Sequence, residues 1–162
     1  MVPLYTTRDL VEPDAAVFGA WLSESEPWRT LGYAAEAWPA YFETLARDRS
    51  RKVYVLTRAA SAVGLAVVRR HVLLGEYLEL FAIAPGERRR GAGKTLLDLV
   101  EMSVFGRTSN LYLCVSDFNA DGRAFYEAAG YREVGCLDAL VVSGRAEILM
   151  RKTTGPARRA SP

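Results

Sequence analysis

Three consecutive segments alternate between strand-like and helix-like patterns, and their order limits the topologies open to the chain. Residues 77–83 form an apolar run that ends at Pro85-Gly86, residues 92–104 carry apolar side chains at helical spacing, and residues 111–115 are again a short apolar run. Two strands joined through a helix run parallel, with a right-handed connection. The fold therefore contains a parallel pair formed by residues 77–83 and 111–115.

The remaining segments predict antiparallel strands and further helices around this pair. Further strands are expected at residues 4–7, 53–57, 63–68, 132–136 and 146–150. Further helices are expected at residues 14–22, 36–48 and 120–129. Gly130 suits the left-handed position after the last of these helices. The predicted fold class is α/β, with a mixed, mostly antiparallel sheet of about seven strands, one parallel pair and about four flanking helices.

Length and composition fit one globular domain. The chain has 162 residues, of which 50% are hydrophobic and 25% charged, as in a single domain with one core. We expect residues 1–152 to form this domain and residues 153–162 to be a disordered tail. The sequence has no secretory pattern at its start and no apolar run near the ~20 residues that span a bilayer. A cytoplasmic protein with no membrane partner is therefore expected.

The charge and the rare reactive residues argue against several function classes. With 21 Lys and Arg against 19 Asp and Glu, the net charge of +2 is too small for bulk electrostatic binding of nucleic acid. Cys114 and Cys136 lack the spacing of a disulfide or zinc pattern, so we expect two small buried hydrophobic residues and no metal. His71, the single histidine, is expected on the surface of a strand and is the only possible base for a histidine-dependent triad.

A basic segment containing two glycines stands between residues 77–83 and the helix that follows. It reads Arg88-Arg89-Arg90-Gly91-Ala92-Gly93-Lys94-Thr95. Glycines at the opening of a helix let the backbone approach a ligand, and the unpaired N–H groups and the helix dipole favour an anion there. The basic side chains add charge that can meet phosphate oxygens. The pattern predicts a pyrophosphate site, although a solvated basic turn would have the same composition.

The same segment approaches the pattern of a nucleotide-binding P-loop. It departs from GxxxxGK[ST] at one position, because Arg88 stands where the first glycine belongs. Residues 111–115, which lead to Asp117, would then imitate the metal-holding strand of such proteins. A P-loop curls around the β-phosphate at that first glycine, and the chain is short for a nucleotide hydrolase. The pyrophosphate of another ligand is therefore the favoured interpretation.

Two motifs resemble those of the GNAT superfamily of N-acetyltransferases. Residues 83–97 look like the main acyl-CoA-binding motif of that family, whose core is [R/Q]xxGx[G/A], and they follow a strand that ends at Pro85. Residues 119–131, with the sequence NADGRAFYEAAGY, are similar to the second motif, Nxx(A)xxFYxxxGF. The motifs occur in the order and at the separation usual in the family. The resemblance implies an acetyl-CoA-dependent N-acetyltransferase whose parallel strands splay apart.

The resemblance also implies where acetyl-CoA would lie. Its pantetheine arm would enter the gap between the splayed strands and pair with one of them, as an added strand pairs with a sheet edge. The N–H groups of the basic loop would hold the pyrophosphate. Asn119 matches a position that meets the cofactor arm and is equally suited to cap a helix. The residues expected to contact the cofactor are Phe81, Ala82, Ile83, Arg88, Arg89, Arg90, Gly91, Ala92, Gly93, Lys94, Thr95, Asn119 and Tyr126.

Direct acyl transfer to an amine in a ternary complex needs a neutral nucleophile and a proton for the departing thiolate. Tyr126 matches the tyrosine that family members often place beside the CoA sulfur as general acid, and the alternative is a helix tyrosine packed on the sheet. Glu79 alternates with Phe81 and Ile83, so the three are expected to share one strand face. Its carboxylate could accept a proton from the incoming ammonium group or only orient the acceptor.

The acceptor is expected to bind between and on the first two helices, the region that shapes this site in the family. Trp28 and Tyr33, together with Glu79, are the expected substrate-binding residues. Trp38 and Tyr41 add to the aromatic cluster, and core packing explains at least half of it. The cluster lies beside three glutamates, Glu24, Glu26 and Glu36. Aromatic faces and carboxylates together suit a cationic amine, carried by a small molecule or a peptide.

Two alternative functions stay open on the sequence. The Pro-Trp pair after the first helix resembles the ribosomal-protein alanine acetyltransferases, but Cys114 stands where those enzymes carry a glutamate. A noncatalytic acyl-CoA-binding module would keep the basic loop and tolerate the loss of Tyr126 and Glu79. The presence of both Tyr126 and Glu79 favours an enzyme. A monomer or a homodimer is expected.

Overall fold

The computed structural model describes residues 4–158, and its elements follow the expected order. The strands are β1 (Thr6–Arg8), β2 (Arg51–Arg58), β3 (Ser61–Val72), β4 (Gly75–Ile83), β5 (Asn110–Ser116), β6 (Arg132–Asp138) and β7 (Ala146–Thr153). The helices are α1 (Asp14–Glu24), α2 (Ala37–Arg47), α3 (Ala92–Phe105) and α4 (Ala120–Ala128), with a short 3-10 turn at Pro85–Glu87. The predicted α/β class, with seven strands and four helices, is confirmed.

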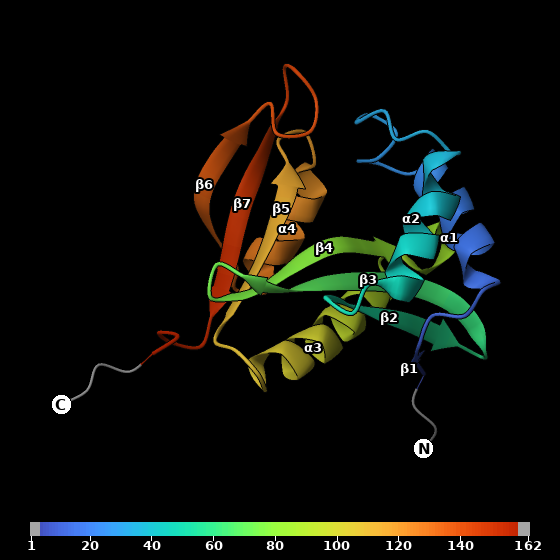
Figure 1. The fold of residues 1–162 in the computed structure, drawn as a ribbon, viewed down its shortest axis with the longest axis horizontal. Coiled ribbons are helices and arrows are strands. Elements are labelled where there is room, and N and C mark those ends of the chain that lie inside the picture. Colours follow the sequence, from blue (N-terminus) through green and yellow to red (C-terminus); the bar gives the residue numbers. More distant parts are fainter. Residues whose placement is uncertain (1–3, 159–162) are drawn as a thin grey trace.

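One sheet contains all the strands, in the order β1-β2-β3-β4-β5-β7-β6. Within the described residues, β4 and β5 form the one parallel pair, and every other pair of neighbours is antiparallel. The parallel ladder covers only three pairs and ends at Leu78 opposite Leu113, although β4 continues to Ile83 and β5 to Ser116. The two strands therefore separate toward their carboxyl ends, as Figure 1 shows.

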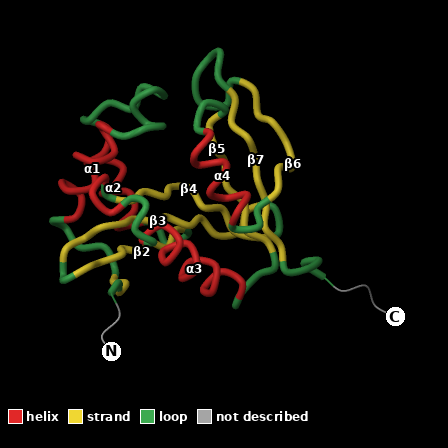
Figure 2. Tube along the Cα trace, turned by 180° about the vertical axis from the view of Figure 1, so that it is seen from behind, coloured by secondary structure: helices red, strands yellow, loops and turns green. Residues whose placement is uncertain are grey.

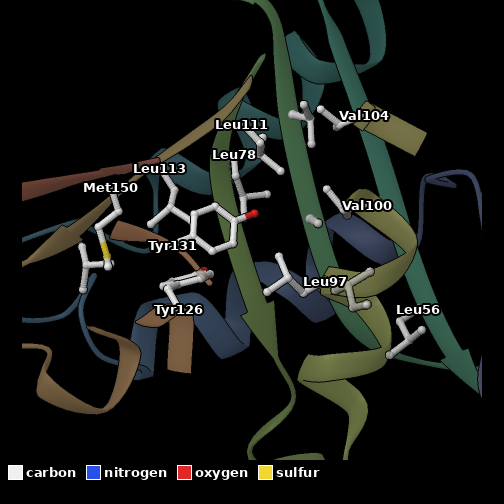
Figure 3. Packing of buried hydrophobic residues seen from close by; sticks show 14 of the residues in the cluster. Leu56, Leu78, Leu97, Val100, Val104, Leu111, Leu113, Tyr126, Tyr131 and Met150 are labelled. Carbon is white, nitrogen blue, oxygen red and sulfur yellow. The ribbon is translucent and has the colours of Figure 1, made fainter. Parts of the chain in front are cut away.

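Helices cover both faces of the sheet and create two cores. The helices α1 and α2 pack over β2, β3 and β4 in Figure 1, and their core includes Phe18, Trp38 and Leu80. The helices α3 and α4 lie on the other face, seen in Figure 2. There α3 buries Leu96, Leu97, Val100 and Val104, whose spacing forms one helix face. Figure 3 shows how Leu97 and Val100 meet side chains of the sheet.

Glu79 lies at an irregularity in β4 that reverses one prediction. Val67 of β3 pairs with Leu80, whereas the next residue, Val68, pairs with Leu78, so Glu79 is the extra residue of a β-bulge. Its side chain contacts Tyr41 of α2. The side chains of Phe81 and Ile83 instead pack against the core formed with α3. The expectation that Glu79 shares a face with these two residues is therefore wrong, because the bulge shifts the alternation by one residue.

Predictions for Gly130 and His71 are confirmed, and the prediction that Cys136 is buried is wrong. Gly130 has φ +94°, which confirms its left-handed position after α4. His71 lies exposed in β3, as predicted. Cys136 is exposed rather than buried because it lies on β6, the last strand of the sheet, whereas Cys114 is half-buried.

The two ends of the described chain differ in detail from the predictions. The first strand begins at Thr6 rather than at Leu4. The tail predicted to be disordered starts inside β7, which includes Thr153, and the N–H of Thr154 donates to the carbonyl of Ser109 at 2.9 Å. The last residues of that tail, 159–162, lie outside the described part of the chain. No helix between residues 4 and 158 combines the length and the apolar character needed to cross a bilayer.

Candidate active site

A cavity of about 170 Å³ opens where β4 and β5 separate. Its walls come from the loop after α1, from both splayed strands, from α4 and from the end of the β6–β7 hairpin. In Figure 1 the loop after α1 and the β6–β7 loop rise on either side of the separated strands. The lining residues are Pro27, Trp28, Leu31, Tyr33, Tyr77, Leu78, Glu79, Leu80, Phe81, Leu113, Cys114, Val115, Ser116, Asn119, Tyr126, Leu140, Val141 and Glu147.

The basic loop leads into α3 through two residues with positive φ. Arg89 has φ +60° and Gly91, the N-cap residue of α3, has φ +86°. No side chain of the described residues caps the helix, and its first closing hydrogen bond runs from the N–H of Thr95 to the carbonyl of Gly91 at 3.0 Å. The N–H groups of the first helical turn therefore lie ahead of that bond, at the positive end of the helix. A Cβ atom at Gly91 would meet no other atom within 4 Å, so a ligand has room to approach.

Four basic side chains of this loop differ in their contacts. Arg88 hydrogen-bonds to neighbouring segments, whereas the other three extend into solvent. The Arg88 guanidinium donates to the carbonyl of Ile83 at 3.3 Å and to Ser25 Oγ at 3.2 Å. Arg89 pairs with Asp121 and Lys94 with Asp98 at the surface, and the exposed Arg90 side chain pairs with Glu87 at 3.9 Å and donates to the carbonyl of Gly86 at 3.5 Å. Exposed pairs of this kind contribute little stability. These three cations are thus able to rearrange around a phosphate group.

The free edge of β4 runs from this loop into the cavity. Phe81, Ala82 and Ile83 pair with β3 on one side. On the other side the ladder with β5 has already ended at Leu78. Backbone groups of this segment that point toward β5 are therefore open to an extended ligand. In the first turn of α3, Gly93 lies next to Phe125 of α4: a Cβ atom added at Gly93 would be 3.5 Å from the Phe125 ring.

Tyr126 lies on the buried side of α4 and reaches the cavity. Its ring packs 6.1 Å from Phe81 and 5.6 Å from Tyr131, between centroids, and Figure 3 shows the two tyrosines side by side. Tyr126 is 9% exposed, and burial raises the pKa of its hydroxyl above the ordinary value of 10.0. No residue between 4 and 158 hydrogen-bonds to that hydroxyl. Tyr126 is therefore a protonated donor free to serve a ligand.

Asn119 caps α4 and also lies at the cavity, whereas its contact with the cofactor arm stays a prediction. Its side chain accepts a hydrogen bond from the N–H of Gly122 at 3.0 Å and so caps α4. The residue also lines the cavity. The Asn119 cap fixes the start of α4, the helix that carries Tyr126. The positions of Asn119 and Tyr126 at the cavity therefore both depend on this cap.

Glu79 is held by three side chains from three different elements. Its Oε1 accepts from Tyr41 of α2 at 3.0 Å, and its carboxylate accepts from Arg51 of β2 at 3.0 Å and from Arg69 of β3 at 2.9 Å. Arg51 in turn contacts Asp48, at the end of α2. These contacts use most of the acceptor capacity of the carboxylate. Glu79 therefore connects α2 to the central strands at the wall of the cavity.

Glu147, which the sequence analysis did not single out, lies on β7 opposite Ser116 of β5. It lines the cavity, is 6% exposed, and accepts a hydrogen bond from Ser116 Oγ at 2.8 Å. Burial and the nearby charge of Asp117 raise the pKa of the Glu147 carboxyl, although the Ser116 hydrogen bond opposes the shift. A glutamate alternating with the core residues Ile148 and Met150 signals the opposite sheet face, but only the register with β5 reveals what that face meets.

The aromatic cluster after α1 is partly cavity wall and partly core. Trp28 and Tyr33 line the cavity, and their substrate-binding role stays a prediction. Trp38 is buried between them, at 6.3 Å from Trp28 and 5.6 Å from Tyr33, whereas Tyr41 binds Glu79. Because Trp38 is buried and both Trp28 and Tyr41 pack against the same core, core packing explains at least half of these aromatics, as predicted.

The three glutamates expected to attract the acceptor do not line the cavity. Glu24, Glu26 and Glu36 are exposed, and Glu26 pairs with Arg29 at 2.7 Å. The expectation that they form the acidic part of the groove is wrong for the inner wall, because the chain turns them outward to solvent. The carboxylates at the cavity are Glu79 and Glu147.

A family model described as Acetyltransferase (GNAT) family matches residues 15–131, more than half of the chain. The chain belongs to this acetyltransferase family. It is therefore an acyltransferase, and the P-loop interpretation of the basic segment is set aside. No curated protein sequence matches the chain significantly.

Solved structures agree with this assignment at the level of the fold. Ard1 from Thermoplasma volcanium superimposes with a TM-score of 0.77 at 20% identity, covering 95% of this chain and 100% of the other. The ribosomal-protein alanine N-acetyltransferase from Escherichia coli gives 0.75 at 20% identity, with 98% and 99% covered. Spermidine N-acetyltransferase from Vibrio cholerae, solved with CoA and spermine, gives 0.74 at 18% identity, with 93% and 95% covered.

Two further features of the site concern Cys114 and possible metal ligands. In this acetyltransferase Cys114 lines the cavity, and burial raises the pKa of its thiol. The described part of the chain contains no group of three or more His, Cys, Asp or Glu side chains arranged to hold a metal ion.

Proposed function

We propose that this acetyltransferase moves an acetyl group from acetyl-CoA to a primary amine by direct transfer in a ternary complex. The observation that carries the proposal is the separation of β4 and β5 after Leu78 and Leu113, which opens a cavity lined by Tyr126 and by the residues after α1. The phosphate-binding loop lies at the end of the same strand. One strand thus connects a site for the anionic end of the donor with a space for the acceptor.

The residues present fit the donor at both of its ends. Gly91 leaves room over the first turn of α3, where N–H groups would bind the pyrophosphate. Arg89, Arg90 and Lys94 would meet the phosphate oxygens as they leave their exposed pairs. The free edge of β4 at residues 81–83 would hydrogen-bond to the amide groups of the pantetheine arm. Acetyl-CoA, when bound, supplies the acetyl group as a reactive thioester.

Tyr126 is the residue we assign as general acid. Its buried hydroxyl stays protonated over the physiological range and faces the cavity without a partner among residues 4–158. A donor in this position would give its proton to the sulfur as the thioester bond breaks. Of the two roles considered for Glu79, its contacts favour orientation of the acceptor wall, since Arg51, Arg69 and Tyr41 already occupy its oxygens.

The proposal is tested by a screen of primary amines with acetyl-CoA, followed by release of the free thiol. With a working acceptor, Tyr126→Phe should lower kcat by about 10²-fold to 10⁴-fold, as for a lost general acid, with little change in CoA affinity. Tyr131→Phe is the matched control. It removes the buried hydroxyl of the neighbouring ring, which has no hydrogen-bond partner among residues 4–158, and should leave kcat unchanged. Equal rates for Tyr126→Phe and wild type would assign Tyr126 to packing alone.

A further inference from the structure

Two carboxylates border the same space on the acceptor side of the sheet. Glu79 comes from β4 and Glu147 from β7, and both line the cavity. Tyr33 and Tyr77 line the same cavity: burial is the main cause that raises the pKa of each phenol, and the charges of both glutamates add to the shift. The two glutamates therefore act on one shared volume.

Only one of these carboxylates is neutralised by the protein. Glu79 is bound by Arg51 and Arg69. Within residues 4–158, no Lys, Arg or His lies within ion-pair distance of Glu147, whose side chain bonds only to the Ser116 hydroxyl. A carboxylate that is 6% exposed is rarely left without a partner. The cavity thus holds an uncompensated negative charge that a bound cation would neutralise.

We propose that Glu147 binds the ammonium group of the acceptor and accepts its proton, and that the acceptor is a monoamine on a compact apolar body. The inference rests on the proposed function and adds to it the residue that receives the amine. It also adds a substrate class, because the cavity offers one uncompensated carboxylate and therefore one cation site.

The proton balance of the reaction follows from this placement. One ammonium proton passes to the Glu147 carboxylate and later to solvent. The neutral nitrogen then forms a bond to the acetyl carbon while the carbon–sulfur bond breaks and its electron pair leaves with sulfur. Sulfur takes the Tyr126 proton, and the second nitrogen proton restores the tyrosine. The products are the amide, the free thiol and one proton released to solvent.

The rim of the cavity indicates the body that carries the amine. Leu140 and Val141 of the β6–β7 loop are exposed large apolar side chains, and both line the cavity. Trp28 and Leu31 line it from the loop after α1. An apolar body placed between these loops would bury their surface. A second ammonium group on the same acceptor would have to lie among these side chains, so a polyamine should bind less well than a monoamine.

Calorimetric titration of the CoA-bound protein with 2-phenylethylamine tests the inference without relying on turnover. At pH 7 the charged amine should bind at least tenfold more tightly than uncharged 2-phenylethanol, and spermidine should bind less tightly than 2-phenylethylamine. Glu147→Gln should reduce amine affinity at least tenfold, to the level of the alcohol. The matched control is Glu133→Gln, which changes the same charge on exposed β6, where Glu133 pairs with Arg123; its amine affinity should equal that of wild type.

A second measurement on wild-type protein keeps the test valid if the variant does not fold. In a carboxyl ¹³C NMR titration, 2-phenylethylamine should lower the apparent pKa of Glu147, since a bound cation favours the ionised form. The other titratable groups near Glu147 are Tyr33, Tyr77, Cys114 and Asp117, and Glu79 lines the same cavity. An amine that leaves the Glu147 titration unchanged, or that binds the folded Gln variant as tightly as wild type, would overturn the inference, as would tighter binding of spermidine.

The design separates this inference from the proposed function. A thermal shift with CoA alone reports on the donor site and involves neither the amine nor Glu147. If CoA produces no shift, the proposed function fails, and the amine titration repeated on free protein still judges Glu147. If CoA binds and the amine does not bind wild type, the Glu147 proposal fails by itself.

Discussion

Glu79 and Glu147 are glutamates on the same face of one sheet, yet their surroundings are opposite. Glu79 lies at a bulge and accepts hydrogen bonds from Tyr41, Arg51 and Arg69. Glu147 lies in a regular part of β7 and has Ser116 as its one side-chain partner within the described chain. The first carboxylate therefore connects elements of the fold, and the second has no cationic partner among residues 4–158. The residue type is shared, and the neighbouring strands decide its role.

The largest effect expected from this comparison is on stability at Glu79. Glu79→Ala removes the carboxylate that Arg51 and Arg69 share, leaves Arg51 with Asp48 alone, and should lower the free energy of unfolding by about 2–4 kcal/mol. The range lies below the full value for a buried pair because Arg69 is 39% exposed. Urea unfolding measures the loss. Glu43→Ala, which breaks an exposed pair with Arg47, is the control and should change stability by less than about 0.5 kcal/mol. Equal losses in the two variants would remove the structural role of Glu79.

A smaller effect is expected at Trp28, across the cavity from both carboxylates. Trp28→Ala should raise the Michaelis constant for the acceptor about tenfold and leave that for acetyl-CoA within about threefold, as for binding lost at one substrate's site. Trp28 also packs edge-on against buried Trp38, so a thermal melt must accompany the kinetics. If Trp28 serves the core alone, stability should fall by roughly 3–5 kcal/mol and both constants should change. A stable variant with normal acceptor kinetics would contradict both roles.

The smallest expected effect is a gain in stability on replacing Glu147, opposite in sign to the loss expected on replacing Glu79. The folded state raises the pKa of Glu147, so it binds that proton more tightly than the unfolded chain does. Stability therefore falls as pH rises from the ordinary glutamate range through the raised pKa, and the ionised carboxylate is unfavourable at pH 7. Glu147→Gln should melt a few degrees higher than wild type at pH 7, with a gain that disappears below the unfolded-state pKa. A variant that melts lower than wild type at pH 7 would show that the ionised carboxylate has a favourable partner.

The architecture was accessible from the sequence because it depends on local signals. Periodic apolar residues and the turn at Pro85-Gly86 gave the strand–helix–strand order, and with it the parallel pair of β4 and β5. Gly130 was recognisable as a position that needs positive φ and has it, whereas the positive φ of Gly91 was not predicted. The loop of the predicted pyrophosphate site was also found from a local signal.

The site was less accessible because its side chains are placed by pairing between distant segments. One extra residue in β4 moves Glu79 to the face of α2, and nothing in the local sequence marks a bulge there. Glu147 meets the cavity only through its register with Ser116, 31 residues away in the chain. Whether a carboxylate is neutralised depends on partners such as Arg51 and Arg69, which strand periodicity does not identify.

A thermal shift tests most directly whether the loop before α3 binds CoA. CoA at about 100 times its dissociation constant should stabilise the protein by about 2.7 kcal/mol, and ATP with magnesium should do much less. Gly91→Glu places a negative side chain over the first turn of α3 and should abolish the CoA shift. Gly91→Asn is the control, because asparagine tolerates positive φ without adding charge, and it should keep part of the shift. A larger shift with ATP than with CoA, or a CoA shift unchanged in Gly91→Glu, would contradict the account.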